Sequence, residues 1–172
     1  EIPAEARTPA RRLEFRNRLK RLMNGFGFTE TITYSFDSEL SRERLRLKKE
    51  DPRQRLLHIL NPLTEDQAVM RTSLIPGMLG SLGYNIAQQL KNLKIFEIGK
   101  IFIKSDHQNL PREPEMLTAL WSGARNDASW HQRETPCDFY DIKGCVEGLI
   151  RELKIDKVRF TKMPAESCDY TR

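Results

Sequence analysis

One carboxylate, Glu97, interrupts the most continuous apolar run of the sequence, which extends from Lys94 to Lys104. Apolar and β-branched residues fall on both sides of this run, a pattern typical of a strand that is covered on both faces of a sheet. A charged group buried there without a partner is strongly unfavourable. Glu97 therefore either forms a structural ion pair or lines a solvated ligand pocket, and the residues themselves leave both possibilities open.

Few other side chains have the types and spacing that catalysis or metal binding requires. Cys137 and His131 are close in sequence, but a thiol–imidazole nucleophile also needs an orienting group and an oxyanion site. His58 lies within a short apolar run without a second ligand at a metal-like spacing, so we expect a core histidine. The cysteines are odd in number and never spaced Cys-x-x-Cys, which argues against a disulfide framework or a zinc site and favours a reducing cytoplasm.

The pattern of apolar residues predicts the elements that must position Glu97. Stripes with a 3.6-residue period predict three amphipathic helices, over residues 15–26, 75–93 and 139–153. Alternating or short apolar runs predict strands over residues 31–36, 56–60, 69–73, 94–104 and 116–121. In the first of these strands the apolar face is formed by Ile32, Tyr34 and Phe36. This mixture of helices and strands indicates an α+β fold.

Length and composition restrict the class of protein. The chain has 172 residues, of which 38% are hydrophobic and 31% charged, as is typical of one globular domain with its own core. Residues 1–10 contain two prolines and no periodicity. We therefore expect a connecting arm over residues 1–10 and one core domain over residues 11–172, together a fragment of a longer chain. No apolar run approaches the ~20 residues that span a bilayer.

Positive charge is concentrated near the start of the chain. The net charge is +5, and basic side chains crowd the segment from Arg7 to Arg21. Such a strip either faces a phosphate backbone or forms the solvated side of a helix. A basic charge permits contact with RNA without showing it, so both interpretations stay open.

Several stretches of the sequence resemble one family of enzymes. Phe96-Glu97-Ile98-Gly99 followed by Phe102 is similar to the second motif of class II aminoacyl-tRNA synthetases. The predicted helix and strand from Arg18 to Phe36 resemble the first motif, which forms the subunit interface in that class. The segments from Asn61 to Leu79 and from Asp138 to Gly144 resemble the beta subunit of bacterial phenylalanyl-tRNA synthetase.

The resemblance implies an α+β class II synthetase-like fold, an antiparallel sheet flanked by helices, that is catalytically degenerate. In the family, Phe102 would be followed by an arginine and then a second glutamate, but this chain has Ile103 and Ser105 at those positions. A guanidinium binds phosphates and carboxylates bidentately, which isoleucine cannot do. At the degenerate motif positions Glu97, Phe102, Ile103 and Ser105 we therefore expect no catalytic, cofactor-binding or metal-binding residue.

The resemblance also implies a scaffolding role in phenylalanine–tRNA ligase. In this family the alpha subunit uses ATP and magnesium, and two alpha and two beta subunits assemble in the cytoplasm to charge tRNA(Phe). This chain would be the non-catalytic core of the beta subunit, without a cofactor of its own and without membrane contact. The first motif implies a subunit interface at Phe26, Phe28, Thr33 and Tyr34. The alternative is a free-standing basic RNA-binding module with a synthetase-like fold, which accounts for the charge but not for the motifs.

Overall fold

The computed structural model describes residues 11–41, 45, 47–48, 50–105 and 110–162, so the predicted connecting arm over residues 1–10 lies outside the described residues. Besides two short 3-10 helices, Pro52–Gln54 and Glu65–Gln67, the described residues form three α-helices and eight strands. In chain order they are α1 (Arg11–Gly25), β1 (Thr29–Glu30), β2 (Phe36–Asp37), β3 (Leu57–His58), β4 (Val69–Met70), α3 (Ile75–Ala87), β5 (Leu93–Lys100), β6 (Glu115–Ser122), β7 (Ala124–Asn126), β8 (Thr135–Pro136) and α4 (Phe139–Glu152).

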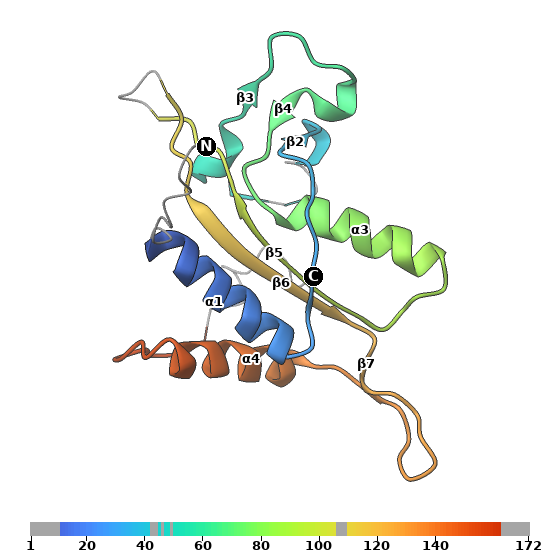
Figure 1. Cartoon of the computed structure of the whole chain (residues 1–172). Helices are drawn as coiled ribbons and strands as arrows, with labels where there is room; N and C mark the ends of the chain where they lie inside the picture. Colours follow the sequence, from blue (N-terminus) through green and yellow to red (C-terminus); the bar gives the residue numbers. More distant parts are fainter. Residues whose placement is uncertain (1–10, 42–44, 46, 49, 106–109, 163–172) are drawn as a thin grey trace, which may run out of the picture.

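A sheet in the order β1-β5-β6 forms the centre of the structure (Figure 1). β5 and β6 are antiparallel along their whole length, with Leu93 opposite Ser122 and Lys100 opposite Glu115. β1 joins the other edge of β5 in parallel, with Thr29 opposite Ile95. The long strands thus follow the predicted antiparallel arrangement, and the short parallel strand is an addition that the sequence did not predict.

α1 and α4 pack against one face of this sheet (Figure 1). Phe96 and Ile98 of β5 form a buried cluster with Met23 of α1 and with Phe28, and apolar side chains of α4 pack against its edge. The ring of Phe28 meets that of Trp121 edge-on, with 6.0 Å between centroids. Burying each such side chain contributes about 1.5–3 kcal/mol, which makes this cluster the main core of the chain.

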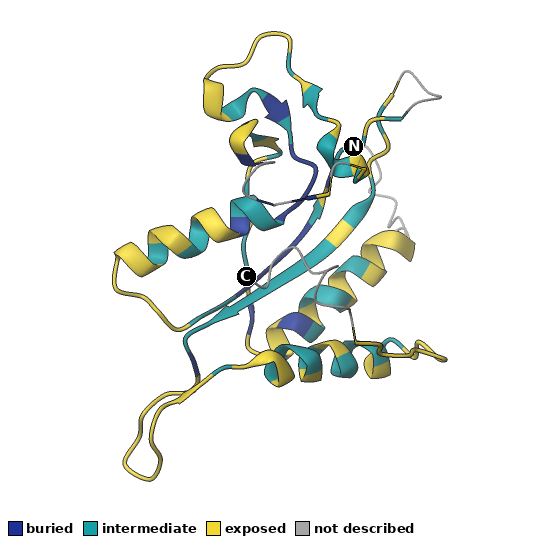
Figure 2. Ribbon diagram, turned by 180° about the vertical axis from the view of Figure 1, so that it is seen from behind, coloured by how far each residue is buried: buried dark blue, intermediate teal, exposed yellow. Residues whose placement is uncertain are grey.

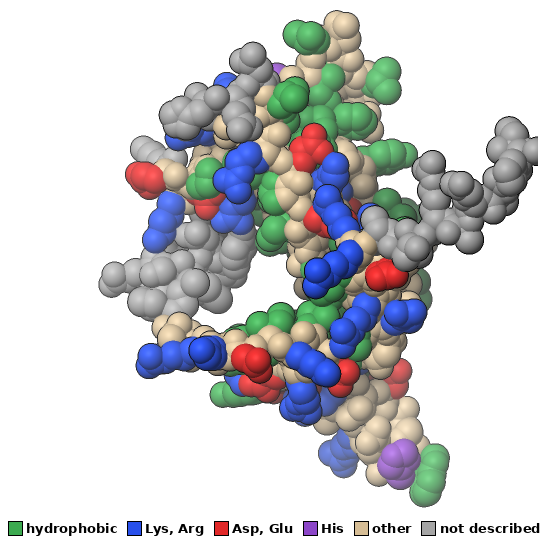
Figure 3. All heavy atoms as spheres, turned by 60° about the vertical axis from the view of Figure 1, so that its left-hand side comes forward, with side chains coloured by type: hydrophobic (Ala, Val, Ile, Leu, Met, Phe, Trp, Pro, Cys, Tyr) green, Lys and Arg blue, Asp and Glu red, His purple; other side chains and the backbone are tan. Residues whose placement is uncertain are grey.

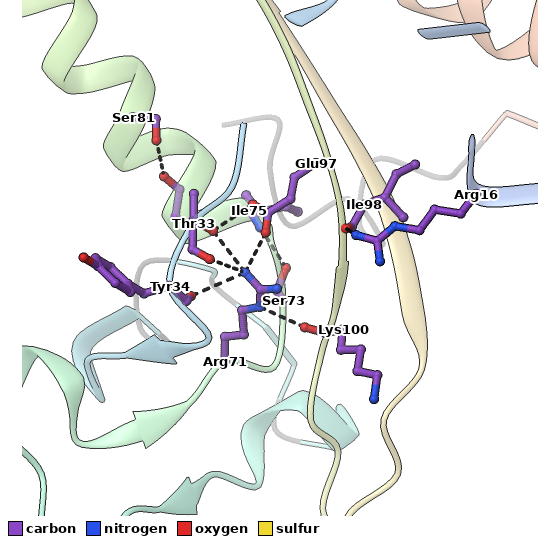
Figure 4. Close-up of polar contacts among 11 residues, drawn as sticks. Arg16, Thr33, Tyr34, Arg71, Ser73, Ile75, Ser81, Glu97, Ile98 and Lys100 are labelled. Carbon is purple, nitrogen blue, oxygen red and sulfur yellow. Dashed lines mark hydrogen bonds and ion pairs between the residues drawn. The ribbon is translucent and has the colours of Figure 1, made fainter. Parts of the chain in front are cut away.

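α3 lies on the other face of the sheet (Figures 1 and 2), and the side chain of Glu97 points toward that side (Figure 4). Pro76 stands in the first turn of α3, where its missing N–H is harmless. Met78 is the only residue of α3 that is fully buried. Among the described residues, no helix has the length and apolarity needed to cross a membrane.

The first predicted strand, over residues 31–36, is wrong in extent. Its ends are held by backbone hydrogen bonds, from Thr31 N to Phe96 O at 2.8 Å and from Arg71 N to Ser35 O at 2.9 Å. No ladder forms between these points, and pairing resumes only at β2. The apolar face that the alternation predicts points outward, because Ile32 is 85% exposed and Tyr34 is 77% exposed.

Two predictions of burial are also wrong. The apolar stripe predicted for the second helix is only partly covered: Ile75 and Leu82 are half-buried, Leu79 and Ile86 are exposed, and the neighbouring Met78 is buried. His58, expected in the core, lies exposed on β3 with its Nδ1 3.2 Å from a carboxylate oxygen of Glu39. The predicted strands over 56–60 and 69–73 each shorten to two residues, which pair in the small sheet β2-β4-β3.

Candidate functional site

Glu97 forms an ion pair with Arg71 inside the fold. Nη1 of Arg71 lies 2.7 Å from Oε1 of Glu97, and the two side chains are 7% and 3% exposed. The hydroxyl of Thr33 donates a hydrogen bond to Oε2 of Glu97 at 2.7 Å. Both carboxylate oxygens therefore have protein partners, as a buried charge requires. Of the two situations that the sequence left open, the structure contains the ion pair.

The guanidinium of Arg71 also binds backbone carbonyls of distant segments (Figure 4). Its Nε donates to the carbonyl of Lys100 at 2.8 Å, and Nη1 donates to the carbonyl of Thr33 at 3.2 Å and that of Tyr34 at 3.4 Å. A planar guanidinium suits this role because its donors diverge at fixed angles. Arg71 thus fixes the segment after β1, the segment after β4 and the end of β5 relative to one another.

Two glycines make room for this cluster. A Cβ at Gly99 would lie 2.4 Å from Nη2 of Arg71, and a Cβ at Gly77 would lie 2.7 Å from Oγ1 of Thr33. Contacts this short do not occur between real atoms, so larger side chains would displace the polar groups. The glycine of the Phe-Glu-Ile-Gly motif therefore has a structural reason in this chain, the approach of Arg71 to Glu97.

The remaining degenerate motif positions lie just beyond β5. The amide of Phe102 donates to the carbonyl of Arg71 at 2.9 Å, and Ile103 forms a single antiparallel bridge with Arg112. Ser105 follows, partly buried, near the edge of the described segment. The backbone at these positions continues the sheet, while Ile103 supplies neither charge nor a side-chain hydrogen bond. The predicted absence of a catalytic group there stays a prediction.

Arg71 is the member of the cluster to which the sequence analysis assigned no role. It stands in the segment 69–73, which was predicted as a short strand, and its charge was not matched with that of Glu97. The sequence does contain a feature that could have indicated the pair. Arg71 adjoins apolar residues in one predicted strand, and Glu97 does so in another. Two opposite charges that each interrupt a buried strand favour one shared ion pair.

A cavity of ≈ 330 Å³ opens beside the ion pair. Its polar lining consists of Thr33, Asp37, Arg71, Ser73 and Ser81. Nε and Nη1 of the guanidinium already donate to carbonyls and to the Glu97 carboxylate, which balances its charge, so this lining does not favour a site for ATP phosphates. Within the described ranges, no cluster of His, Cys, Asp or Glu could hold a metal ion.

The four residues predicted at a subunit interface occupy different environments. Phe28 is 3% exposed, and Phe26 packs against the same core and against Gly148 of α4. Thr33 is engaged with Glu97, whereas the ring of Tyr34 points away from the cluster into solvent (Figure 4). The interface stays a prediction, and of these four residues Tyr34 is the one whose side chain a partner could cover extensively.

Basic residues of α1 are largely paired with acidic or carbonyl groups. Arg12 and Arg16 each lie 3.4 Å from a carboxylate oxygen of Glu115, and Lys20 lies 2.6 Å from Glu30. Figure 3 shows acidic side chains among the basic ones on this face. The basic strip is therefore a mixed, solvated surface in the part of the chain that the structure describes, which does not favour an RNA-binding module.

The fold has counterparts among solved structures. It resembles pyrrolysyl-tRNA synthetase from Desulfitobacterium hafniense, with a TM-score of 0.60 over 84% of this chain and 48% of that chain, at 17% sequence identity. A second structure of that enzyme gives a TM-score of 0.55 over 86% of this chain and 46% of that chain, at 18% identity. This similarity confirms the predicted α+β fold of the class II aminoacyl-tRNA synthetases.

The sequence comparisons define the family more narrowly. Residues 1–169 match the phenylalanyl tRNA synthetase beta chain CLM domain, and the chain belongs to this family. Phenylalanine–tRNA ligase beta subunits are 37% identical in Geobacter metallireducens and 41% identical in Syntrophus aciditrophicus. The matches cover 90% and 92% of this chain but 19% and 20% of those proteins. The chain thus spans about a fifth of the length of these relatives.

Proposed function

We propose that this chain is a non-catalytic core domain of a phenylalanine–tRNA ligase beta subunit, which holds the catalytic alpha subunit in place. The observation that carries the proposal is that both carboxylate oxygens of Glu97 are bound inside the fold, one by Arg71 and the other by Thr33. A class II site needs charged groups free to bind ATP and an amino acid. Here the buried charges are used to hold the fold together, and Ile103 stands where the family resemblance places the arginine.

The complete ligase would contain two alpha and two beta subunits and would charge tRNA(Phe) with phenylalanine in the cytoplasm. ATP and magnesium would bind to the alpha subunit, and tRNA(Phe) would reach this domain only through the assembled enzyme. Membership of a beta-chain family supports an alpha-subunit partner. The solvent-facing apolar side chains of Ile32 and Tyr34 support a partner surface at the segment between β1 and β2.

The partner surface can be tested with Tyr34→Ala in a full-length beta subunit produced together with the alpha subunit. Because the ring is 77% exposed, its loss should leave the thermal stability of the beta subunit nearly unchanged. It should weaken association with the alpha subunit about tenfold or more, as expected of an interface aromatic residue. Sedimentation of the mixed subunits measures this association. Unchanged association would contradict the proposed surface.

Phe28→Ala provides the contrasting control. Phe28 belongs to the buried core, so the substitution should lower the free energy of unfolding by about 3–5 kcal/mol. If both substitutions reduced stability and association equally, Tyr34 would be an ordinary structural residue. Catalysis is tested separately, by incubating the beta subunit alone with ATP, magnesium, phenylalanine and labelled pyrophosphate. Exchange of label into ATP without the alpha subunit would refute a non-catalytic domain.

A further inference from the structure

Asp37 is a carboxylate that the ion pair of Glu97 and Arg71 does not use. It stands half-buried at the end of β2 and lines the cavity of ≈ 330 Å³ beside that pair. The amide of Ser38 donates to Oδ1 of Asp37 at 2.8 Å, and the hydroxyl of Ser41 donates to the same oxygen. Within the part of the chain that the structure describes, Oδ2 has no hydrogen-bond donor and the carboxylate has no cation beside it. The cavity therefore contains a charged acceptor that is still free.

Most other polar groups of the lining already donate their protons within the protein (Figure 4). The hydroxyl of Thr33 donates to Glu97 at 2.7 Å, and that of Ser81 donates to the carbonyl of Gly77 at 3.1 Å. Nε and Nη1 of Arg71 donate to carbonyls and to Glu97. A hydroxyl whose proton is used in this way still has a lone pair with which to accept. The cavity thus offers a ligand mainly acceptors.

The charge around the cavity favours a ligand of the same kind. Arg71 is balanced by Glu97, so the carboxylate of Asp37 leaves one negative charge in excess. Ser73, whose oxygen accepts from the amide of Ile75 at 3.2 Å, keeps a hydroxyl proton for a neutral acceptor. A carboxylate or phosphate ligand would be repelled by Asp37 without a free cation in the described lining to bind it.

The apolar part of the lining restricts the ligand further. Ile32, Tyr34 and Phe36 contribute it, from the segment that leads into β2 and from β2 itself. A volume of ≈ 330 Å³ lies at the lower end of the range for small-molecule pockets. A ligand that fits therefore combines a cationic donor group, for Asp37, with a compact apolar body.

We propose that this cavity binds a small protonated primary amine, with its ammonium group on Asp37 and its apolar body against Ile32 and Phe36. An ammonium has three donors and no acceptor, which suits Oδ2 of Asp37 and the hydroxyl oxygen of Ser81. An amino acid or a nucleotide is disfavoured, because its anionic groups would lack a partner. This inference goes beyond the role proposed above for the domain and does not depend on it.

The test uses a full-length beta subunit and probes of nearly equal shape. 2-Phenylethylamine is a cation at neutral pH, 2-phenylethanol is neutral and 3-phenylpropionate is an anion. Titrations followed by saturation-transfer difference NMR measure the dissociation constant of each probe. We expect the amine to bind about tenfold or more tightly than the alcohol, and the anion to bind more weakly than the alcohol.

Variants of the beta subunit locate the binding. Asp37→Asn removes the charge but keeps an oxygen for the amide of Ser38, so thermal unfolding should show a folded protein. It should weaken binding of the amine about tenfold or more and leave binding of the alcohol unchanged. Asp66→Asn is the matched control, because Asp66 lines the neighbouring hollow and not this cavity. Ser81→Leu fills the cavity without a change of charge and should weaken binding of both probes.

Several outcomes would overturn the inference. Equal affinities for the amine and the alcohol would mean that the ammonium group has no partner in the protein. An amine that binds Asp37→Asn and Ser81→Leu as tightly as the unaltered subunit would occupy another site. Tighter binding of the anion would mean that Arg71, and not Asp37, is available to ligands. Because none of these measurements involves the alpha subunit, such a failure would leave the proposed function intact.

Discussion

Nη1 of Arg71 lies 2.7 Å from Oε1 of Glu97, although 26 residues separate the two in sequence. The pair is buried, and each member also has hydrogen bonds to neutral groups of the protein. Such a pair contributes little when it is compared with an apolar pair of the same shape. Removing one partner, however, leaves an uncompensated charge in a medium that solvates it poorly.

Glu97→Gln should therefore destabilise the chain although the side chain keeps its shape. We expect the free energy of unfolding to fall by about 3–5 kcal/mol, measured by urea denaturation. Glu113→Gln is the matched control, because Glu113 pairs with Lys100 at 2.7 Å in an exposed position, and it should cost at most about 1 kcal/mol. An equal fall in the free energy of unfolding in the two variants would mean that the buried pair matters no more to stability than the exposed pair.

The same substitution should have opposite effects at two glycines of α3. Gly77→Ala places a Cβ 2.7 Å from Oγ1 of Thr33, so either the hydrogen bond to Glu97 or the backbone must shift, and stability should fall. Gly80→Ala meets no atom and should raise the free energy of unfolding by up to about 1 kcal/mol. Thermal unfolding measures both. A stabilised Gly77→Ala variant would contradict the close contact of α3 with Thr33.

The two tryptophans should differ sharply in their effect on stability. Trp121 packs edge-on against Phe28, lies beneath Nζ of Lys94 at 3.7 Å and donates to the carbonyl of Ala124 at 3.2 Å. Trp121→Ala should lower the free energy of unfolding by about 3 kcal/mol. Trp130 is 97% exposed on the β7–β8 hairpin, and Trp130→Ala should change it by less than about 0.5 kcal/mol. Chemical denaturation followed by circular dichroism compares them without relying on tryptophan fluorescence.

The start of α4 should respond to acid. Burial raises the pKa of Asp141, but hydrogen bonds from the amide of Asp138 and the guanidinium of Arg125 outweigh it, so the pKa lies below its ordinary value. Because the pKa of Asp141 is lower in the folded chain than in the unfolded chain, its ionised carboxylate stabilises the fold. This stabilisation is complete above the unfolded pKa of about 4, and it is lost as the pH falls through the folded pKa. Arg125→Met should move the Asp141 carboxyl titration upward in a carbon-13 NMR experiment.

Arg133→Met is the control for that titration, since Arg133 is an exposed residue of the same hairpin. It should leave the Asp141 pKa unchanged. If both arginine variants shifted the titration equally, the effect would come from overall charge and not from the contact of Arg125 with Asp141, in which Nε lies 2.6 Å from Oδ1.

The long elements of this fold could be predicted from the sequence because their patterns are local. The helices that became α1, α3 and α4 and the strands that became β5 and β6 each repeat their apolar period over many residues. The short strands could not be predicted in extent, since two paired residues leave no period to detect. The partner of Glu97 could not be predicted either, because the arrangement of the strands decides which charged residue lies beside it.

The exposed faces of α3 and of the segment 31–36 show a second reason why the sequence does not predict the whole fold. Alternation at Ile32 and Tyr34 and the apolar period at Leu79 and Ile86 are typical of surfaces that become covered, but the structure leaves all four side chains exposed. The sequence pattern states that a side chain favours cover and not which molecule provides it, so the exposure of these side chains leaves the predicted interface at Tyr34 a prediction.

The contacts around Arg71 join residues that are synthesised at different times during translation. Thr33 emerges from the ribosome 64 positions before Glu97, its carboxylate acceptor, and 38 positions before Arg71. Until β5 has been synthesised, β1 lacks its partner strand and the hydroxyl of Thr33 lacks its carboxylate acceptor. A nascent beta chain paused before that strand should therefore be the species that chaperones hold longest.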